Sequence, residues 1–170
     1  MSQLSASSFD LPEAPSCDDE TCLVPTLDAA KLCPGSQTTG LKVDLVTVKA
    51  LVNADALRRL DGRAYRFCPA PDCDVVYFDP TANSVFRKRD LEVRVGQKET
   101  DDPVPLCYCF DFTAADLRRE LAARGKTEIP TYIAAEVKAG HCACEVKNPQ
   151  GYCCLGNVSK ALERIQPRST

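Results

Sequence analysis

The 170-residue sequence has no apolar run that approaches the length of a membrane helix. Its first residues lack the basic and apolar regions of a signal peptide. We therefore expect a cytoplasmic protein without membrane insertion. The formal net charge of −3 gives no excess of positive charge to attract nucleic acid. A Gly-rich nucleotide loop and a nucleophile–base pair are also missing, so nucleotide binding and hydrolysis are not expected.

Histidine is scarce too, since His141 is the only one in the sequence. A Rieske-type iron–sulfur centre needs two histidine ligands. We therefore expect His141 at the surface or beside a metal ligand, not on a metal.

Cysteine, in contrast, is abundant: the chain has eleven. Disulfides are rare in the cytosol, and an odd number fits a fully paired disulfide framework poorly. The cysteines are also clustered, as two C-x4-C pairs, two C-x-C pairs and one adjacent pair: Cys17 and Cys22, Cys68 and Cys73, Cys107 and Cys109, Cys142 and Cys144, Cys153 and Cys154. This clustering predicts metal ligation for most of them.

The pattern of the first half predicts an α+β unit. Residues 1–25 are rich in Ser, Pro and acidic residues, and we expect a disordered arm there. Residues 26–100 are expected to form a small helix and β-hairpin unit stapled by zinc, because its core is thin. A short strand over 43–46, a helix from Thr47 to about residue 60 and strands over 64–67, 75–78 and 84–95 are predicted. The turn between the second and third strands carries Cys68 and Cys73.

Residues 101–170 are expected to form a helical-hairpin domain. Thr113 is a good N-cap for a helix that Gly125 ends, and a second helix is predicted from Thr131 to Gly140. A turn over 148–151 and a final helix capped by Asn157 follow. Because a helical hairpin places its ends side by side, the C-x-C before it can meet the cysteine loop after it. Two converging loops suit an iron–sulfur cluster, and zinc sites prefer longer C-x2-4-C spacings, although an all-zinc site stays open.

The order C-x-C, helical hairpin, Gly and cysteine loop is similar to the bacterioferritin-associated ferredoxin type of 2Fe–2S domain, although a longer segment replaces the final C-x-x-C. From Cys33 to the last helix, the chain resembles the N-terminal domain of CopZ-type copper chaperones, which carries a 2Fe–2S cluster and a zinc ion. The motifs that carry this resemblance are Tyr65-Arg-Phe-Cys68, Cys73-Asp-Val-Val-Tyr-Phe78, Val93-Arg-Val-Gly-Gln-Lys98, Val104-Pro-Leu-Cys-Tyr-Cys109 and Asn148-Pro-Gln-Gly-Tyr-Cys-Cys154.

The resemblance implies two sets of metal ligands. For the 2Fe–2S cluster they are Cys107, Cys109, one of Cys142 or Cys144 and one of Cys153 or Cys154, with Cys144 and Cys154 favoured by the loop spacing. For zinc they are Cys22, Cys33, Cys68 and Cys73. Family members have C-P-x-C where this chain has Cys33-Pro34-Gly35-Ser36, so one thiol is missing, and Cys22 or Cys17 is expected to replace it.

These features predict an iron–sulfur and zinc protein that acts as a one-electron redox partner in copper and metal handling. Any enzymatic activity is expected to be at most metal-ion reduction. The expected partners are a redox protein or a metal-transport protein, together with copper ions. Family members also carry a second domain with an M-x-C-x-x-C copper site, but this chain has no C-x-x-C, so we expect a domain that stands alone. A metal- or redox-sensing module and a purely structural zinc scaffold are the alternatives.

Overall fold

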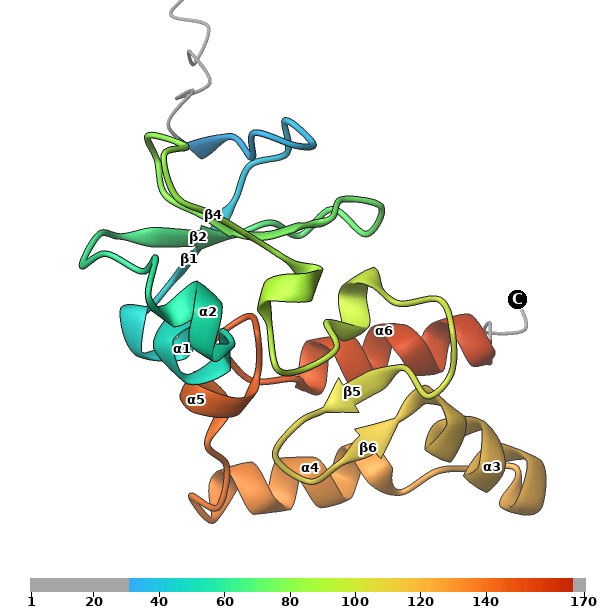
Figure 1. Cartoon of the computed structure of the whole chain (residues 1–170). Helices are drawn as coiled ribbons and strands as arrows, with labels where there is room; N and C mark the ends of the chain where they lie inside the picture. Colours follow the sequence, from blue (N-terminus) through green and yellow to red (C-terminus); the bar gives the residue numbers. More distant parts are fainter. Residues whose placement is uncertain (1–30, 167–170) are drawn as a thin grey trace, which may run out of the picture.

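The structure is a computed structural model, and it describes residues 31–166. The predicted arm over residues 1–25, with Cys17 and Cys22, therefore lies outside the described residues. Helices and strands both occur, so the mixed α and β content is confirmed (Figure 1). Among residues 31–166, no helix has the length and apolar character needed to cross a membrane.

The first half is built on a four-stranded antiparallel sheet with the order β1-β2-β3-β4. Its strands are β1 (Leu41–Val43), β2 (Tyr65–Phe67), β3 (Val75–Phe78) and β4 (Val85–Arg87). The hairpin of β2 and β3 confirms the two strands predicted on either side of the cysteine turn. β1 pairs with the outer edge of β2 and β4 with that of β3, so the unit is larger than the predicted helix and hairpin.

The strand predicted over residues 84–95 is mostly wrong. It ends at Arg87, because the Asp90 carboxylate accepts the Arg87 N–H at 2.8 Å and closes a short 3-10 helix, η2 (Lys88–Asp90). The strand predicted over 43–46 is also displaced, since residues from Leu45 onward are helical.

The single helix predicted from Thr47 is two helices, α1 (Leu45–Leu51) and α2 (Ala54–Leu57). The chain breaks at Asn53, whose side-chain oxygen accepts the Ala56 N–H at 2.9 Å and caps α2. Thr47 does not cap a helix; it is fully buried inside α1. These helices and the sheet enclose one apolar core of ten buried residues, which is more than the sequence indicates: Val43, Val48, Val52, Ala56, Tyr65, Phe67, Val76, Tyr77, Phe86 and Val95.

The 3-10 helix η3 (Gly96–Lys98) ends the first half, and the second half begins with a two-stranded sheet of β5 (Pro105–Cys107) and β6 (Phe112–Thr113). Four helices follow: α3 (Ala114–Arg124), α4 (Ile129–Lys138), α5 (Cys144–Lys147) and α6 (Leu155–Ile165). Helices α3, α4 and α6 and the small sheet surround a second apolar core that includes Leu106, Leu117, Ile133 and Val158.

The helix ends test the sequence rules directly. Thr113 caps α3 in a reciprocal capping box with Asp116, and Gly125 ends the helix with φ of 68°, as predicted. Helix α4 begins two residues before Thr131, since Pro130 suits the first turn of a helix. Helix α6 begins at Leu155, so Asn157 is not its cap; the Asn157 amide instead donates to Gln150 Oε1.

The two halves are in direct contact. Helix α5 packs against α1, as Figure 1 shows below the sheet. The Tyr77 hydroxyl on β3 donates to the Pro149 carbonyl oxygen at 2.8 Å in a buried position, and the Gln97 amide donates to Gln150 Oε1 at 2.6 Å. The hydrogen bonds of Tyr77 and Gln97 fix the 148–151 loop of the second half against the first half.

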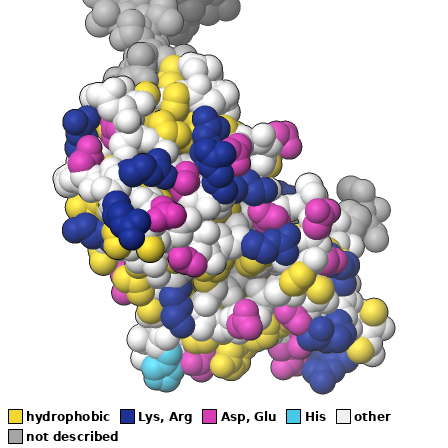
Figure 2. All heavy atoms as spheres, in the orientation of Figure 1, with side chains coloured by type: hydrophobic (Ala, Val, Ile, Leu, Met, Phe, Trp, Pro, Cys, Tyr) yellow, Lys and Arg dark blue, Asp and Glu magenta, His cyan; other side chains and the backbone are white. Residues whose placement is uncertain are grey.

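On the face drawn in Figure 2, Lys and Arg side chains are interspersed with Asp and Glu.

Candidate metal centres

Three thiols converge at the outer end of the β2–β3 hairpin. The Sγ atoms of Cys33, Cys68 and Cys73 all lie within 4.8 Å of one another, and those of Cys33 and Cys73 are 3.8 Å apart. Cys33 and Cys68 are fully buried, beside Val75 and Phe78. Around a tetrahedral zinc ion with Zn–S bonds of about 2.3 Å, sulfur atoms lie about 4 Å apart. The spacing of these three thiols fits one zinc ion.

Two tight turns provide hydrogen bonds to these sulfur atoms. In residues 33–38, the Gln37 N–H donates to the Cys33 carbonyl at 2.9 Å and the Cys33 N–H to the Thr38 carbonyl at 2.9 Å. Burial raises the pKa of the Cys33 thiol, but hydrogen bonds from the Ser36 hydroxyl and from the N–H groups of Gly35 and Ser36 outweigh it, so its pKa is lowered. Cys68 receives a backbone N–H from Ala70, but burial raises its pKa overall. Donors to sulfur stabilise a thiolate, which is the form that binds a metal.

A buried lysine supports the second of these turns. Lys98 on η3 is only 6% exposed, and its Nζ donates to the carbonyl oxygens of Ala70 at 2.6 Å and Cys73 at 3.0 Å. The same ammonium lies 5.8 Å from the centre of the Phe67 ring. Its positive charge also favours the thiolate of Cys68. Lys98 was not predicted as part of the site, because it is distant in sequence from the cysteines. Its position at the end of the Val93–Lys98 motif was the only feature of the sequence that pointed to it.

The predicted zinc ligands are thus only partly brought together. Cys33, Cys68 and Cys73 meet, whereas Cys22, predicted as the fourth ligand, lies outside the described residues. Ser36 lies beside these thiols: its Oγ is 3.3 Å from Cys68 Sγ and also contacts the Cys33 thiol.

Four further thiols converge in the second half, in two pairs. Cys109, on the turn between β5 and β6, has its Sγ 3.6 Å from that of Cys144, at the start of α5. Cys107, at the end of β5, shares a hydrogen bond with Cys154, the residue that precedes α6. Within residues 31–166, only the Cys33 group brings three ligand atoms within 4.8 Å of one another. The second set is therefore two pairs of thiols and not one compact group of four.

Backbone N–H groups donate hydrogen bonds to sulfur atoms of these pairs. The Ala143 N–H donates to Cys109 Sγ at 3.3 Å. The hydrogen bond with Cys154, together with the N–H groups of Phe110 and Cys109, lowers the pKa of Cys107 to about 6 against the opposing effect of burial. The pKa of Cys154 is raised, first because it shares that hydrogen bond with Cys107 and then by burial.

The remaining thiols and the histidine lie farther out. Cys142 and Cys153 are half-buried, whereas Cys144 and Cys154 are buried, and all nine described cysteines are free thiols. His141 is exposed and its Nδ1 lies 2.8 Å from Glu136 Oε2, so the predicted surface position is confirmed.

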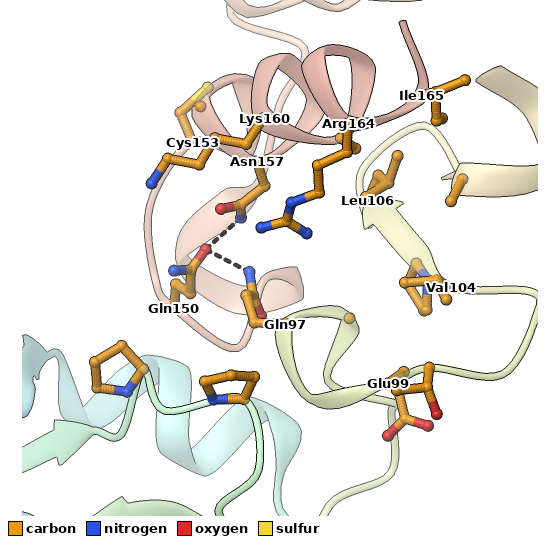
Figure 3. A pocket seen from close by; sticks show the side chains of 18 of the residues that line it. Gln97, Glu99, Val104, Leu106, Gln150, Cys153, Asn157, Lys160, Arg164 and Ile165 are labelled. Atoms are coloured by element: carbon orange, nitrogen blue, oxygen red, sulfur yellow. Dashed lines mark hydrogen bonds between the residues drawn. The ribbon is translucent and has the colours of Figure 1, made fainter. Parts of the chain in front are cut away.

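A cleft of about 720 Å³ separates the outer surfaces of the two halves (Figure 3). Pro69 and Pro71 of the zinc-side turn form one wall, and residues of α6 form another. Figure 3 shows Gln150 accepting hydrogen bonds from Gln97 and Asn157 inside it, with the Arg164 side chain directed into the cleft. Cys153 also lines this cleft, so a half-buried thiol next to the buried Cys154 can be reached from it.

Comparisons with known proteins show similarity to one family. Residues 30–92 match the CopZ family described as "Zinc binding domain". The copper chaperone CopZ of Archaeoglobus fulgidus is 35% identical over 144 residues, covering 79% of this chain and 68% of that protein. The X-ray structure of the N-terminal domain of A. fulgidus CopZ superposes with a TM-score of 0.64 at 33% identity, covering 76% of this chain and 95% of that domain.

Proposed function

The chain belongs to the CopZ family, and from this premise we propose that it is a zinc and iron–sulfur protein that transfers single electrons in copper handling. The proposed zinc ligands are Cys33, Cys68 and Cys73, completed by the fourth ligand considered below. The proposed ligands of a 2Fe–2S cluster are Cys107, Cys109, Cys144 and Cys154. The zinc half corresponds to residues 26–100 and the cluster half to residues 101–170.

The observation that carries the cluster proposal is the division of the thiols into two pairs. A single zinc ion would draw four sulfur atoms to within about 4 Å of one another. Two irons instead take two thiolates each, which fits the 3.6 Å Cys109–Cys144 pair and the hydrogen-bonded Cys107–Cys154 pair. The pairs come from three separate segments, as the predicted convergence of the C-x-C turn and the cysteine loop requires. A helical-hairpin 2Fe–2S domain remains part of this proposal.

Bound there, a 2Fe–2S cluster would supply one-electron transfer. The protein's own groups would hold the sulfur atoms and adjust their charge: the Ala143 N–H donates to Cys109, and the N–H groups of Cys109 and Phe110 to Cys107. Such donors to sulfur are among the means by which a protein raises the reduction potential of a cluster. The apolar packing of Cys107 and Cys154 among Leu106 and Val158 would exclude water from the site.

Cupric ion is the proposed substrate, because the relative is named a copper chaperone. It would take up one electron and leave as cuprous ion, for transfer to a metal-transport partner. Cys153 lines the open cleft beside Cys154, so the cleft gives a substrate ion or a partner protein an approach to the cluster ligands. Metal- or redox-sensing through the half-buried Cys142 and Cys153 is the second candidate, since both thiols lie within electrostatic reach of Cys144.

Anaerobically reconstituted protein tests the proposal. We expect two irons and one zinc per chain, visible charge-transfer absorption, and an electron paramagnetic resonance signal after reduction with dithionite. After removal of excess dithionite, cupric ion is added with a chelator that reports cuprous ion. Cys107→Ser is the control, because it retains the other thiols, which can themselves reduce copper.

The redox proposal requires faster copper reduction by the intact protein than by Cys107→Ser. Equal rates would remove its support and leave sensing as the better reading. A colourless protein that holds only zinc would contradict the cluster itself and favour a structural scaffold.

A further inference from the structure

The three-thiol site has no fourth thiol among the described residues, and a serine stands in its place. We propose that Ser36 Oγ occupies the fourth corner of the Cys33, Cys68 and Cys73 site, so that bound zinc keeps one position that a small thiol can enter. This inference rests on the zinc site proposed above and departs from the expectation that Cys22 completes it.

The geometry of the turn places Ser36 at this corner. Its Oγ is 3.3 Å from Cys68 Sγ and within hydrogen-bond reach of Cys33, whereas the Cys33–Cys73 pair spans 3.8 Å on the other side. The hydroxyl is therefore as close to the Cys68 sulfur atom as the sulfur atoms of Cys33 and Cys73 are to each other. Backbone hydrogen bonds that join Cys33 to Gln37 and to Thr38 close the turn, and the Thr38 N–H donates to Ser36 Oγ at 3.3 Å, which holds this hydroxyl in place.

The charge around the site fits three thiolates better than four. A zinc ion with three thiolates has a net charge of −1, and the buried Lys98 ammonium, bonded to the carbonyl oxygens of Ala70 and Cys73, balances it. A fourth thiolate would leave one negative charge uncompensated in a buried site, which is costly. Of the carboxylates on the packed elements, Glu99 is occupied by Lys88 and Arg94, and Asp74 pairs with Arg87 at the surface.

The chemistry of zinc gives the consequence. Sites that only stabilise a fold are usually closed by four cysteine or histidine ligands, whereas sites with three protein ligands hold an exchangeable group in the fourth position. A neutral serine hydroxyl is a much weaker zinc ligand than a thiolate. A small thiol can therefore displace Ser36 Oγ, and a chelator can begin to remove the metal at the same point.

Zinc K-edge X-ray absorption on the full chain measures the sulfur ligands directly and is not affected by iron. We expect three sulfur atoms and one oxygen in the wild type, and four sulfur atoms in Ser36→Cys. Cys17→Ser and Cys22→Ser are expected to match the wild type. Four sulfur atoms in the wild type, falling to three in Cys22→Ser, would overturn the inference. Protein that binds no zinc at all would instead contradict the proposed zinc site.

Ligand exchange provides the second measurement. Adding 2-mercaptoethanol should raise the sulfur count of the wild type above three and leave Ser36→Cys unchanged; no change in either protein contradicts a replaceable position. Transfer of zinc to a colorimetric chelator should be slower in Ser36→Cys by about tenfold or more. Ser159→Cys on the exposed surface of α6 adds a thiol elsewhere and should exchange like the wild type. Equal rates of zinc transfer in all three proteins would also contradict the proposal that Ser36 Oγ is the fourth zinc ligand.

Discussion

The Nζ atom of Lys98 lies 3.0 Å from the carbonyl oxygen of Cys73 and donates a hydrogen bond to it inside the protein. Through this contact, a residue between the two halves of the chain holds the turn that presents two of the zinc-side thiols. The bond to the Ala70 carbonyl at 2.6 Å completes the arrangement, so both ends of the turn depend on one buried charge.

Lys98→Met should destabilise this turn. The variant leaves two main-chain carbonyl groups without their charged donor, at a cost of about 1–3 kcal/mol of unfolding free energy. Chemical denaturation measures the loss, and zinc release to a chelator should become faster. Lys126→Met is the matched control, because Lys126 pairs with Glu128 at the surface, where such pairs contribute about 0–1 kcal/mol. Equal effects of the two variants would contradict the role given to Lys98.

Gly35→Ala should weaken zinc binding. A Cβ atom at residue 35 would lie 2.9 Å from Cys73 Sγ and 3.1 Å from Val75 Cγ2, so the thiol or the turn would have to shift. Gly62→Ala is the control, since nothing lies within 4 Å of its Cβ position. Zinc affinity measured by competition with a chelator should fall only in Gly35→Ala. An unchanged affinity would show that the close approach of the turn to Cys73 does not matter for the metal.

Serine substitutions should separate the cluster ligands from their neighbours in sequence. Cys144→Ser and Cys154→Ser are expected to lose iron and visible absorption, because these buried thiols complete the two pairs. Cys142→Ser and Cys153→Ser are expected to retain two irons, since both thiols are half-buried and outside the pairs. Iron analysis with zinc as an internal reference checks this. If Cys142→Ser lost iron and Cys144→Ser retained it, Cys142 would be the ligand in place of Cys144, and the same holds for Cys153 and Cys154.

Tyr77→Phe should loosen the contact between the two halves. It removes the buried hydrogen bond to the Pro149 carbonyl oxygen and leaves that oxygen without a donor, which costs about 1–3 kcal/mol. Amide hydrogen exchange should accelerate most at residues 148–151. Tyr132→Phe, at a position where the side chain is 47% exposed, should change neither stability nor exchange. If exchange rises uniformly through the chain, Tyr77 has no specific role at this contact.

Asp79 should make stability depend on pH. Burial raises the pKa of its carboxyl, but hydrogen bonds from Thr81 and from the Ser84 N–H outweigh burial, so its pKa is lowered below the ordinary 3.8. A carboxyl whose pKa is lower in the folded state contributes stability above its unfolded pKa, and that contribution disappears as pH falls through the folded pKa.

The corresponding variant is Asp79→Asn. We expect its stability deficit relative to the wild type to be constant between pH 5 and 7 and to shrink as the pH falls below about 4. Denaturation of both proteins across this pH range measures the difference in their unfolding free energies. Thiol protonation weakens metal binding equally in both proteins, so its effect cancels in this difference. A deficit that grows on acidification would contradict the lowered pKa.

Local chemistry in the sequence predicted several elements correctly. Thr113 with Asp116 and Gly125 define the ends of α3 because capping and left-handed conformations depend on neighbouring residues. The two strands beside Cys68 and Cys73 follow from their own apolar and aromatic residues. The helix through Asn53 and the strand beyond Arg87 were predicted wrongly, because Asn53 caps α2 and Asp90 closes η2. In both cases a polar side chain competed successfully with the regular pattern.

At the metal sites, the clustered spacing of the cysteines predicted two groups of thiols, and the single histidine argued against a Rieske-type centre. How the thiols of each group combine depended on the packing of the elements. This packing paired Cys109 with Cys144 and Cys107 with Cys154, and it brought the Ser36 hydroxyl to 3.3 Å from Cys68 Sγ and Lys98 Nζ to the carbonyl oxygen of Ala70. These relationships join residues up to 47 positions apart, between Cys107 and Cys154, so they depend on how the elements pack and not on any local preference.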